Sequence, residues 1–435
     1  MSRPSLGGLR QMLAPRGHIY RGWWLVLASA NVQLLGSMLW MQSYGAYVVL
    51  MEDEFGWSKT AFAGAFAFAR LESGILGPVQ GILVDRFGPR LILTIGMILF
   101  GVGFLFFSQV DTLLTFYLAF GLMALGSSLG GFATLMVSLV NWFSRYRSTA
   151  VAVSQMGYSF GGFCVPLLVI ALEAFGWRTT ALLSGILVLA VGIPLVQPIR
   201  HRPAEIGETV DGLPEAPAAT VAGGGLSFTA RQALATPAFW LISFGHAIAL
   251  LAVAALLVHL IPHLTEQLDY SLEAAATAVA TLTVFQVLGQ MSGGFLGDRI
   301  SKRLICSVCM LLHGAGLLVL AQASSTLDVA FFAALHGLAW GARGPQMIAL
   351  RADYFGASAF GTILGFSSLI VMLGTMGGPV FVGYLADRSG SYATGFTGLA
   401  GVCVLGALCF ALAAPPKLPI GTERARAGGA SGRSG

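Results

Sequence analysis

Three ionisable side chains stand inside long apolar stretches of this 435-residue chain. Arg343 lies in the segment 339–345 (AWGARGP), and Arg70 and Glu72 lie two residues apart in another apolar run. A charge in the middle of a bilayer costs an apparent ~2.5–3.5 kcal/mol, so such a residue usually faces a wet cavity and has a function. A guanidinium binds a carboxylate through two parallel hydrogen bonds. We therefore expect Arg343 and Arg70 to bind an anion and Glu72 to carry a proton.

Histidine supplies a second candidate for proton coupling, because its charge changes near neutral pH. His336 stands seven residues before Arg343, which places the two side chains on one face of a helix. The other intramembrane histidines are expected to be packing residues. The pair Cys306 and Cys309 has the spacing C-x-x-C, but no second pair or neighbouring histidine completes a metal site. The sequence predicts no metal and no cofactor.

Composition indicates the solvent that surrounds these residues. Hydrophobic residues make up 56% of the chain and charged residues only 10%, against roughly 25% charged in soluble domains. A membrane-spanning helix needs ~20 apolar residues. Twelve stretches qualify, and their expected bounds are 22–51, 58–83, 89–108, 112–142, 148–173, 177–198, 237–262, 271–297, 303–323, 327–352, 358–382 and 392–414. The prediction is an all-α membrane protein of twelve transmembrane helices in two pseudo-symmetric six-helix bundles.

The bundles are expected at 22–198 and 237–414, with a linker at 199–236 and tails at 1–21 and 415–435. The linker is rich in proline, glycine and charge, so it has little to bury. With both termini placed inside, 19 of the 24 lysines and arginines fall in inner segments, Arg70 and Arg343 fall within helices, and only Lys59, Arg178 and Arg388 fall outside. This bias predicts that both termini and the linker are cytoplasmic.

One charged motif occurs in both halves, at the end of a long apolar run each time. The first copy is 81–90 (GILVDRFGPR), and the second is 294–303 (GFLGDRISKR), about half the chain away. Such internal duplication is typical of secondary transporters. Asp85 and Asp298 are expected to accept hydrogen bonds from free amides at the starts of the eleventh and the fifth helix, where the helix dipole is positive.

Paired glycines recur at matching helices of the two halves. They occur as G-x-x-x-G at 77–81 and 289–293, and again at 157–161 and 361–365. Small residues let helices in lipid approach closely. The recurrence suggests faces along which the two halves slide.

The repeated motif resembles G-x-L-x-D-R-x-G-x-R, the signature loop of the major facilitator superfamily, and the resemblance extends over nearly the whole chain outside the tails and the linker. It implies alternating access, with the first, fourth, seventh and tenth helices around the substrate cavity, so that Arg343 lies on a lining helix. It also implies a conformational latch between the halves, with Arg145 or Arg147 beside Asp85. The expected latch residues are Gly81, Asp85, Arg86, Arg90, Arg145, Arg147, Asp298 and Arg299.

A narrower resemblance is to the monocarboxylate transporters and the bacterial oxalate/formate antiporters. It is carried by the segments 142–157 (WFSRYRSTAVAVSQMG), 44–47 (YGAY), 54–58 (EFGWS), 355–356 and 360–361. Those carriers place a cation on the eighth or the eleventh helix, whereas here neither helix has one in its interior. The anion-binding charge must then come from Arg343 or Arg70. Polar residues expected to complete the substrate site are Tyr44, Tyr47, Gln155 and Gln286.

We therefore expect a secondary active transporter in the inner or plasma membrane, moving a small organic anion, favouring a carboxylate, by proton symport or anion exchange. One alternative is an exporter of neutral or cationic drug-like compounds, which Glu72 keeps open. Another is a transport-inactive membrane sensor or scaffold. No nucleophile–base set and no nucleic-acid-binding face is apparent, so neither an enzyme nor a nucleic-acid partner is expected. The sequence does not determine the oligomeric state.

Overall fold

The computed structural model describes residues 12–15, 17–57, 59–213 and 228–417, and these form helices and the connections between them. The first bundle is built from the following elements: α2 (Arg21–Gly36), the π-turn η1 (Ser37–Met41), α3 (Tyr44–Phe55), α4 (Lys59–Phe87), α5 (Pro89–Phe107), α6 (Leu113–Leu129), α7 (Phe132–Trp142), α8 (Arg147–Phe163), α9 (Val165–Leu187), the π-turn η2 (Val188–Gly192) and α10 (Ile193–Val196).

The second bundle consists of six long helices in sequence. They are α12 (Pro237–Gln267), α13 (Leu272–Gly297), α14 (Lys302–Ala321), α15 (Thr326–Phe355), α16 (Phe360–Ser389) and α17 (Tyr392–Leu412). Side-chain caps begin several of them: Ser271 accepts from the backbone of α13, and Ser325 forms a capping box with Asp328 at the start of α15. Each helix matches one predicted span.

Three of the helices predicted for the first bundle are interrupted. The fourth predicted helix breaks at Gly130 and Gly131 into α6 and α7. The fifth predicted helix is interrupted at Cys164, between α8 and α9, and within α9 the left-handed φ of 76° at Gly176 separates the fifth span from the sixth. The first predicted helix changes to π-helical geometry at η1 and is interrupted at residues 42–43, before α3 begins. The breaks divide or bend the predicted elements without changing their order.

Nine helical stretches of the described chain are long and apolar enough to cross a membrane. One of them, Arg147–Val196, is 50 residues long and contains the two spans that meet at Gly176. Two further helices of 29 and 30 residues, α4 and α15, carry the intramembrane charges, which lower their mean hydropathy. Together these helices give the twelve spans predicted from the sequence.

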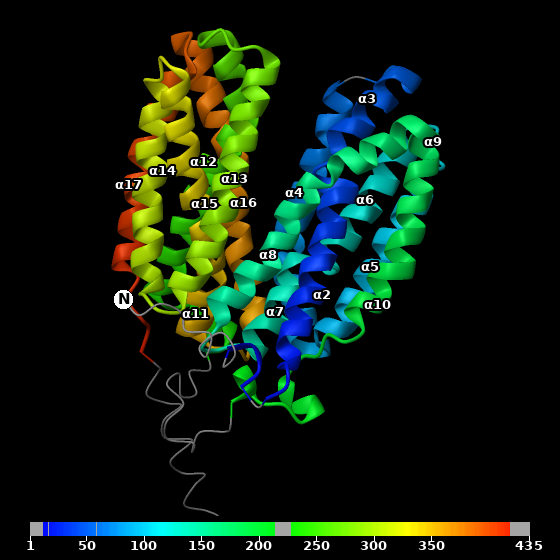
Figure 1. Ribbon diagram of the computed structural model, residues 1–435, viewed down its shortest axis with the longest axis vertical. Coiled ribbons are helices and arrows are strands. Elements are labelled where there is room, and N and C mark those ends of the chain that lie inside the picture. The colour runs from blue at the N-terminus through cyan, green and yellow to red at the C-terminus, as the bar shows by residue number, and fades with distance from the viewer. Residues whose placement is uncertain (1–11, 16, 58, 214–227, 418–435) are drawn as a thin grey trace, which may run out of the picture.

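The two bundles stand side by side and meet most closely at the end where the linker leaves them (Figure 1). There α4 packs against α16, and α8 packs against α13. A Cβ at Gly81 would overlap the carbonyl oxygen of Gly361, so glycine is needed for this approach. The pairs at 77–81 and 361–365 thus lie between the bundles, as expected. The other two pairs do not: Gly157 faces Ala30 within the first bundle, and positions 289–293 face α15 within the second.

The linker residues 199–213 are attached to the first bundle, whereas the backbone amide of Phe228 donates to the Phe355 carbonyl of the second bundle at 3.1 Å. The Asp211 carboxylate accepts hydrogen bonds from the backbone amides of Ser144, Arg145 and Tyr146, at 2.8–3.4 Å. Burial raises the pKa of Asp211, while these amide hydrogen bonds act to lower it. The Tyr20 hydroxyl bonds the carbonyl of Thr209 at 3.0 Å. The segment 199–213 therefore buries more than its composition predicts, whereas 214–227 lies outside the described residues.

Candidate functional site

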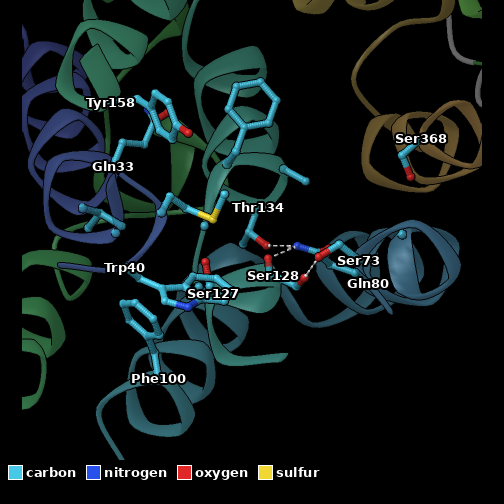
Figure 2. A pocket seen from close by; sticks show the side chains of 18 of the residues that line it. Gln33, Trp40, Ser73, Gln80, Phe100, Ser127, Ser128, Thr134, Tyr158 and Ser368 are labelled. Carbon is cyan, nitrogen blue, oxygen red and sulfur yellow. Dashed lines mark hydrogen bonds between the residues drawn. The ribbon is translucent and has the colours of Figure 1, made fainter. Parts of the chain in front are cut away.

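A cavity of about 360 Å³ opens in the first bundle and reaches across to α16 of the second. It is lined by α2, η1, α4, α5, α6, α7, α8 and η2, with Gly361, Leu364, Gly365 and Ser368 supplied by α16. Figure 2 shows Ser368 on a helix that stands apart from those of the other labelled residues. The volume falls within the range typical of small-molecule sites. A ligand here would contact both bundles.

One wall of the cavity is polar, and its side chains are fixed by hydrogen bonds. The Gln80 amide donates to the Ser128 carbonyl oxygen at 2.6 Å and to the Thr134 hydroxyl at 3.0 Å. The hydroxyls of Ser73 and Ser128 lie 2.7 Å apart (Figure 2). The facing wall is aromatic, with Trp40 packed edge-on against Phe100. Such a mixture suits a small ligand with one polar end.

Arg70 is the only charged residue among the described residues that line this cavity. Its side chain is exposed to the cavity, and its guanidinium lies 4.8 Å from the centre of the Phe66 ring. The Tyr158 side chain, 39% exposed and also lining the cavity, lies close enough to interact with it electrostatically. No carboxylate of the described chain lies within ion-pair distance of Arg70. Its charge is therefore available to an anionic ligand.

Glu72 points to a different side of α4 from Arg70, as expected for residues two apart in a helix. Its Oε2 accepts from the hydroxyls of Ser73 at 3.3 Å and Ser128 at 3.4 Å. Its Oε1 is buried and has no hydrogen-bond partner in the described structure. Since both serines line the cavity, their hydroxyls connect this half-buried carboxyl group to it.

The four polar residues expected to complete the substrate site lie elsewhere. Tyr44 donates to the Phe62 carbonyl oxygen at 2.7 Å and stacks on Phe66, next to the cavity but not among its lining residues. Tyr47 is 3% exposed and packs against Phe107. Gln155 faces Gly344 across the bundle interface, and the backbone of Gln286 packs against Gly341.

Arg343 and His336 also lie away from the cavity, in contrast to the expectation that Arg343 faces it. Both are 1% exposed and point into the interior of the second bundle. Gly337 and Gly341 place the adjoining face of α15 against α13, which turns Arg343 toward α14 and α17 instead. In this conformation neither residue can touch a ligand in the cavity.

Asp85 joins the two bundles at the position expected for the first latch. Its carboxylate accepts from the amides of Gly361 at 3.0 Å and Thr362 at 2.7 Å, and from the Thr362 hydroxyl at 2.7 Å. These are the free amides at the start of α16, the eleventh span, where the helix dipole favours a negative charge. The contact has the geometry that the sequence predicted.

Asp298 forms the second latch by the same arrangement in the opposite direction. It accepts from the amides of Ser148 at 2.8 Å and Thr149 at 3.0 Å, and from the Thr149 hydroxyl at 2.6 Å. These groups begin α8, the fifth span. The two contacts therefore correspond to each other in the duplicated halves, and each carboxylate accepts three hydrogen bonds from the opposite bundle.

The cations expected near the first latch have other partners. Arg147 pairs with Asp353 of the second bundle, which also binds Lys302 at 2.8 Å, so the expected pairing of Arg145 or Arg147 with Asp85 is wrong. The remaining cations bind locally: Arg90 to Gln197 at 2.8 Å, Arg86 over Phe87, Arg145 over Tyr146, and Arg299 to the Phe295 carbonyl at 2.9 Å.

Sequence reasoning missed Asp353 and Ser368. Asp353 stands next to the aromatic segment 354–355 and looked like an ordinary loop charge, although it joins the bundles through Arg147. Ser368 is one of many hydroxyls in apolar helices, and only the packing of α16 on α4 brings it to the cavity. A charge flanked by a helix end and an aromatic pair was the only available signal for Asp353.

Comparison with known proteins agrees with this architecture. Monocarboxylate transporter 11 of Homo sapiens is 28% identical over 424 residues, which cover 93% of this chain and 86% of that protein. Among solved structures, the human organic anion transporter MFSD10 (TETRAN) has a TM-score of 0.68 at 14% identity, covering 89% of this chain and 98% of that one. The Escherichia coli fucose:proton symporter FucP has a TM-score of 0.66 at 14% identity, covering 91% and 97%.

The family model of the Major Facilitator Superfamily matches residues 30–276 and 242–431. The two matches overlap and together span most of the chain, including both copies of the repeated loop. This match, the twelve spans and the paired latches have one explanation: the chain belongs to the Major Facilitator Superfamily of membrane transporters.

Proposed function

We propose that this transporter moves a small organic anion, of the carboxylate class, through the cavity beside Arg70. The observation that carries the proposal is the charge of the cavity, where Arg70 is the only ionisable group among the described lining residues with a full charge at neutral pH. A guanidinium matches the geometry of a carboxylate. The similarity to a human monocarboxylate transporter supports the same substrate class.

The alternating-access cycle is proposed to use the two latches. Both carboxylates hold the bundles together at the linker end, so we assign this conformation as open toward the opposite side. The concentration of lysine and arginine at the linker end favours placing that end in the cytoplasm of a plasma or inner membrane. In this orientation the cavity receives its substrate from outside the cell.

Glu72 is the proposed site of proton coupling. Its carboxyl group is half buried, has an unpaired oxygen, and reaches the cavity through the hydroxyls of Ser73 and Ser128. A proton on Glu72 removes the only negative charge near Arg70 on α4, which strengthens the attraction of the cavity for an anion. Symport of a proton with a carboxylate follows from this arrangement.

Uptake by proteoliposomes tests the substrate class. We expect the wild type to take up one or more members of a panel of labelled short-chain carboxylates and to ignore labelled amines. Arg70→Gln should lose nearly all of this uptake, and Arg70→Lys should retain part of it, because the lysine keeps the charge but not the forked donor. Arg388→Gln, at an exposed position at the end of α16, is the matched control and should behave as wild type.

Two results would contradict the proposal. Carboxylate uptake by Arg70→Gln at the wild-type rate would remove the cavity arginine from substrate binding. Uptake of amines with no uptake of carboxylates would favour the exporter of cationic compounds instead.

A further inference from the structure

A second group of buried ionisable side chains lies inside the second bundle, away from the proposed substrate cavity. Its centre is Arg343 of α15, whose side chain is 1% exposed. The guanidinium Nε and Nη1 atoms are buried and have no hydrogen-bond partner in the described structure. An arginine stays protonated in proteins, so this position holds a buried positive charge.

The groups around Arg343 include thiols and imidazoles and, among the described side chains, no carboxylate. The thiols of Cys306, Cys309 and Cys403, on α14 and α17, lie close enough to interact with Arg343 electrostatically. The imidazoles of His313 and His336 are hydrogen-bonded through their Nδ1 atoms at 3.1 Å. Their Nε2 atoms are buried and without a partner among the described residues. Because one Nδ1 donates and the other accepts in this pair, one of the two Nε2 atoms carries a hydrogen and can donate to an anion.

A second buried cation increases the excess of positive charge. Arg351 is 1% exposed and donates to Ser367 at 2.7 Å, to the Met347 carbonyl at 2.7 Å and to His246 at 3.2 Å, all uncharged groups. The described acidic residues of this bundle lie at helix ends or in the turns between helices, at Glu266, Asp269, Asp298, Asp328, Asp353 and Asp387. The interior therefore holds two guanidinium charges and, among the described side chains, no carboxylate.

We propose that the second bundle binds a small monovalent anion, of the size of a halide or formate, against Arg343 and the His313–His336 pair. A buried charge without a partner is strongly unfavourable, and three of the unpaired atoms are donors: Nε and Nη1 of Arg343, and the Nε2–H of the histidine that accepts the Nδ1 hydrogen bond. The anion must be small, because Cys306, His313 and His336 are at most 1% exposed. The site is separate from the proposed substrate cavity and does not depend on its assignment.

Equilibrium binding of radiolabelled chloride to purified wild-type protein tests this site. We expect one saturable equivalent per chain, and a higher melting temperature in chloride than in gluconate at equal ionic strength. Arg343→Gln should weaken chloride binding by at least roughly tenfold, because it removes a charged donor. Arg70→Gln and Arg388→Gln should leave chloride binding unchanged. Unlabelled formate and acetate, added as competitors, distinguish a halide site from a site for small carboxylates.

The outcomes separate this site from the substrate cavity. Absence of both chloride and formate binding in wild type would overturn the proposal, as would wild-type affinity in Arg343→Gln. Loss of binding in Arg70→Gln would assign the anion to the cavity and also overturn it. If Arg343→Gln is not monodisperse, Arg343→Lys serves instead. The lysine keeps the positive charge but loses the forked guanidinium donors, so chloride affinity should fall. Undiminished chloride affinity in Arg343→Lys would refute the site.

Discussion

Replacing Asp85 with asparagine tests the first latch most directly. The carboxylate receives three hydrogen bonds from Gly361 and Thr362, and hydrogen bonds to a charged group contribute ~1.5–3 kcal/mol each against ~0.5–1.5 for neutral ones. The asparagine side chain would keep one acceptor and turn an N–H₂ group toward amide donors. A net loss of about 2–3 kcal/mol follows, which shifts the equilibrium between the two access states by about 30- to 150-fold.

The shift can be measured as a distance between spin labels at the linker end. Leu91 on α5 and Leu304 on α14 are suitable sites, because both are exposed and stand in different bundles near this end. We expect Asp85→Asn to populate a longer distance, with turnover slowed and substrate affinity changed little. Asp53→Asn, at an exposed position of α3, is the control.

The second latch supplies an internal comparison. Asp298 also accepts three hydrogen bonds, so the structure predicts a shift of similar size for Asp298→Asn. An unaltered distance distribution and normal turnover in folded Asp85→Asn protein would refute the latch.

Three further predictions concern coupling and the bundle interface. Glu72→Gln should abolish substrate accumulation driven by a pH gradient but spare exchange of substrate between the two sides of the membrane. His336→Gln should leave accumulation intact. The reverse pattern in a transport assay would contradict the assignment of the proton to Glu72. Gly81→Ala should destabilise the closed linker end by ~1–3 kcal/mol, because its Cβ would overlap a carbonyl oxygen of α16, while Gly401→Ala should be neutral in thermal melts. Asp353→Asn should shift the equilibrium between the two access states, read from the same label distance, by only about two- to fivefold, because its side chain is 36% exposed and such ion pairs contribute little. A shift in this equilibrium as large as that of the latch variants would show the ion pair to be dominant.

The latch contacts could be predicted from the sequence because they depend on local chemistry. A carboxylate at a helix end seeks free amides, and the duplication indicates which helices supply them. The partners of the cations could not be predicted in this way. Arg147 has a long flexible side chain, and its choice of Asp353 over Asp85 depends on where two separate bundles place their helix ends.

The sequence by itself determined that this chain spans a membrane twelve times, that its halves are duplicated, and that Asp85 and Asp298 join them. Only the tertiary structure decided which intramembrane charge meets the cavity. Arg70 lines it, whereas Arg343 points into the second bundle. The physical reason is that lipid and bundle interior are both apolar, so hydrophobic periodicity does not fix the rotation of a helix. Close packing at Gly337 and Gly341 fixes it for α15, and that packing exists only in the folded bundle.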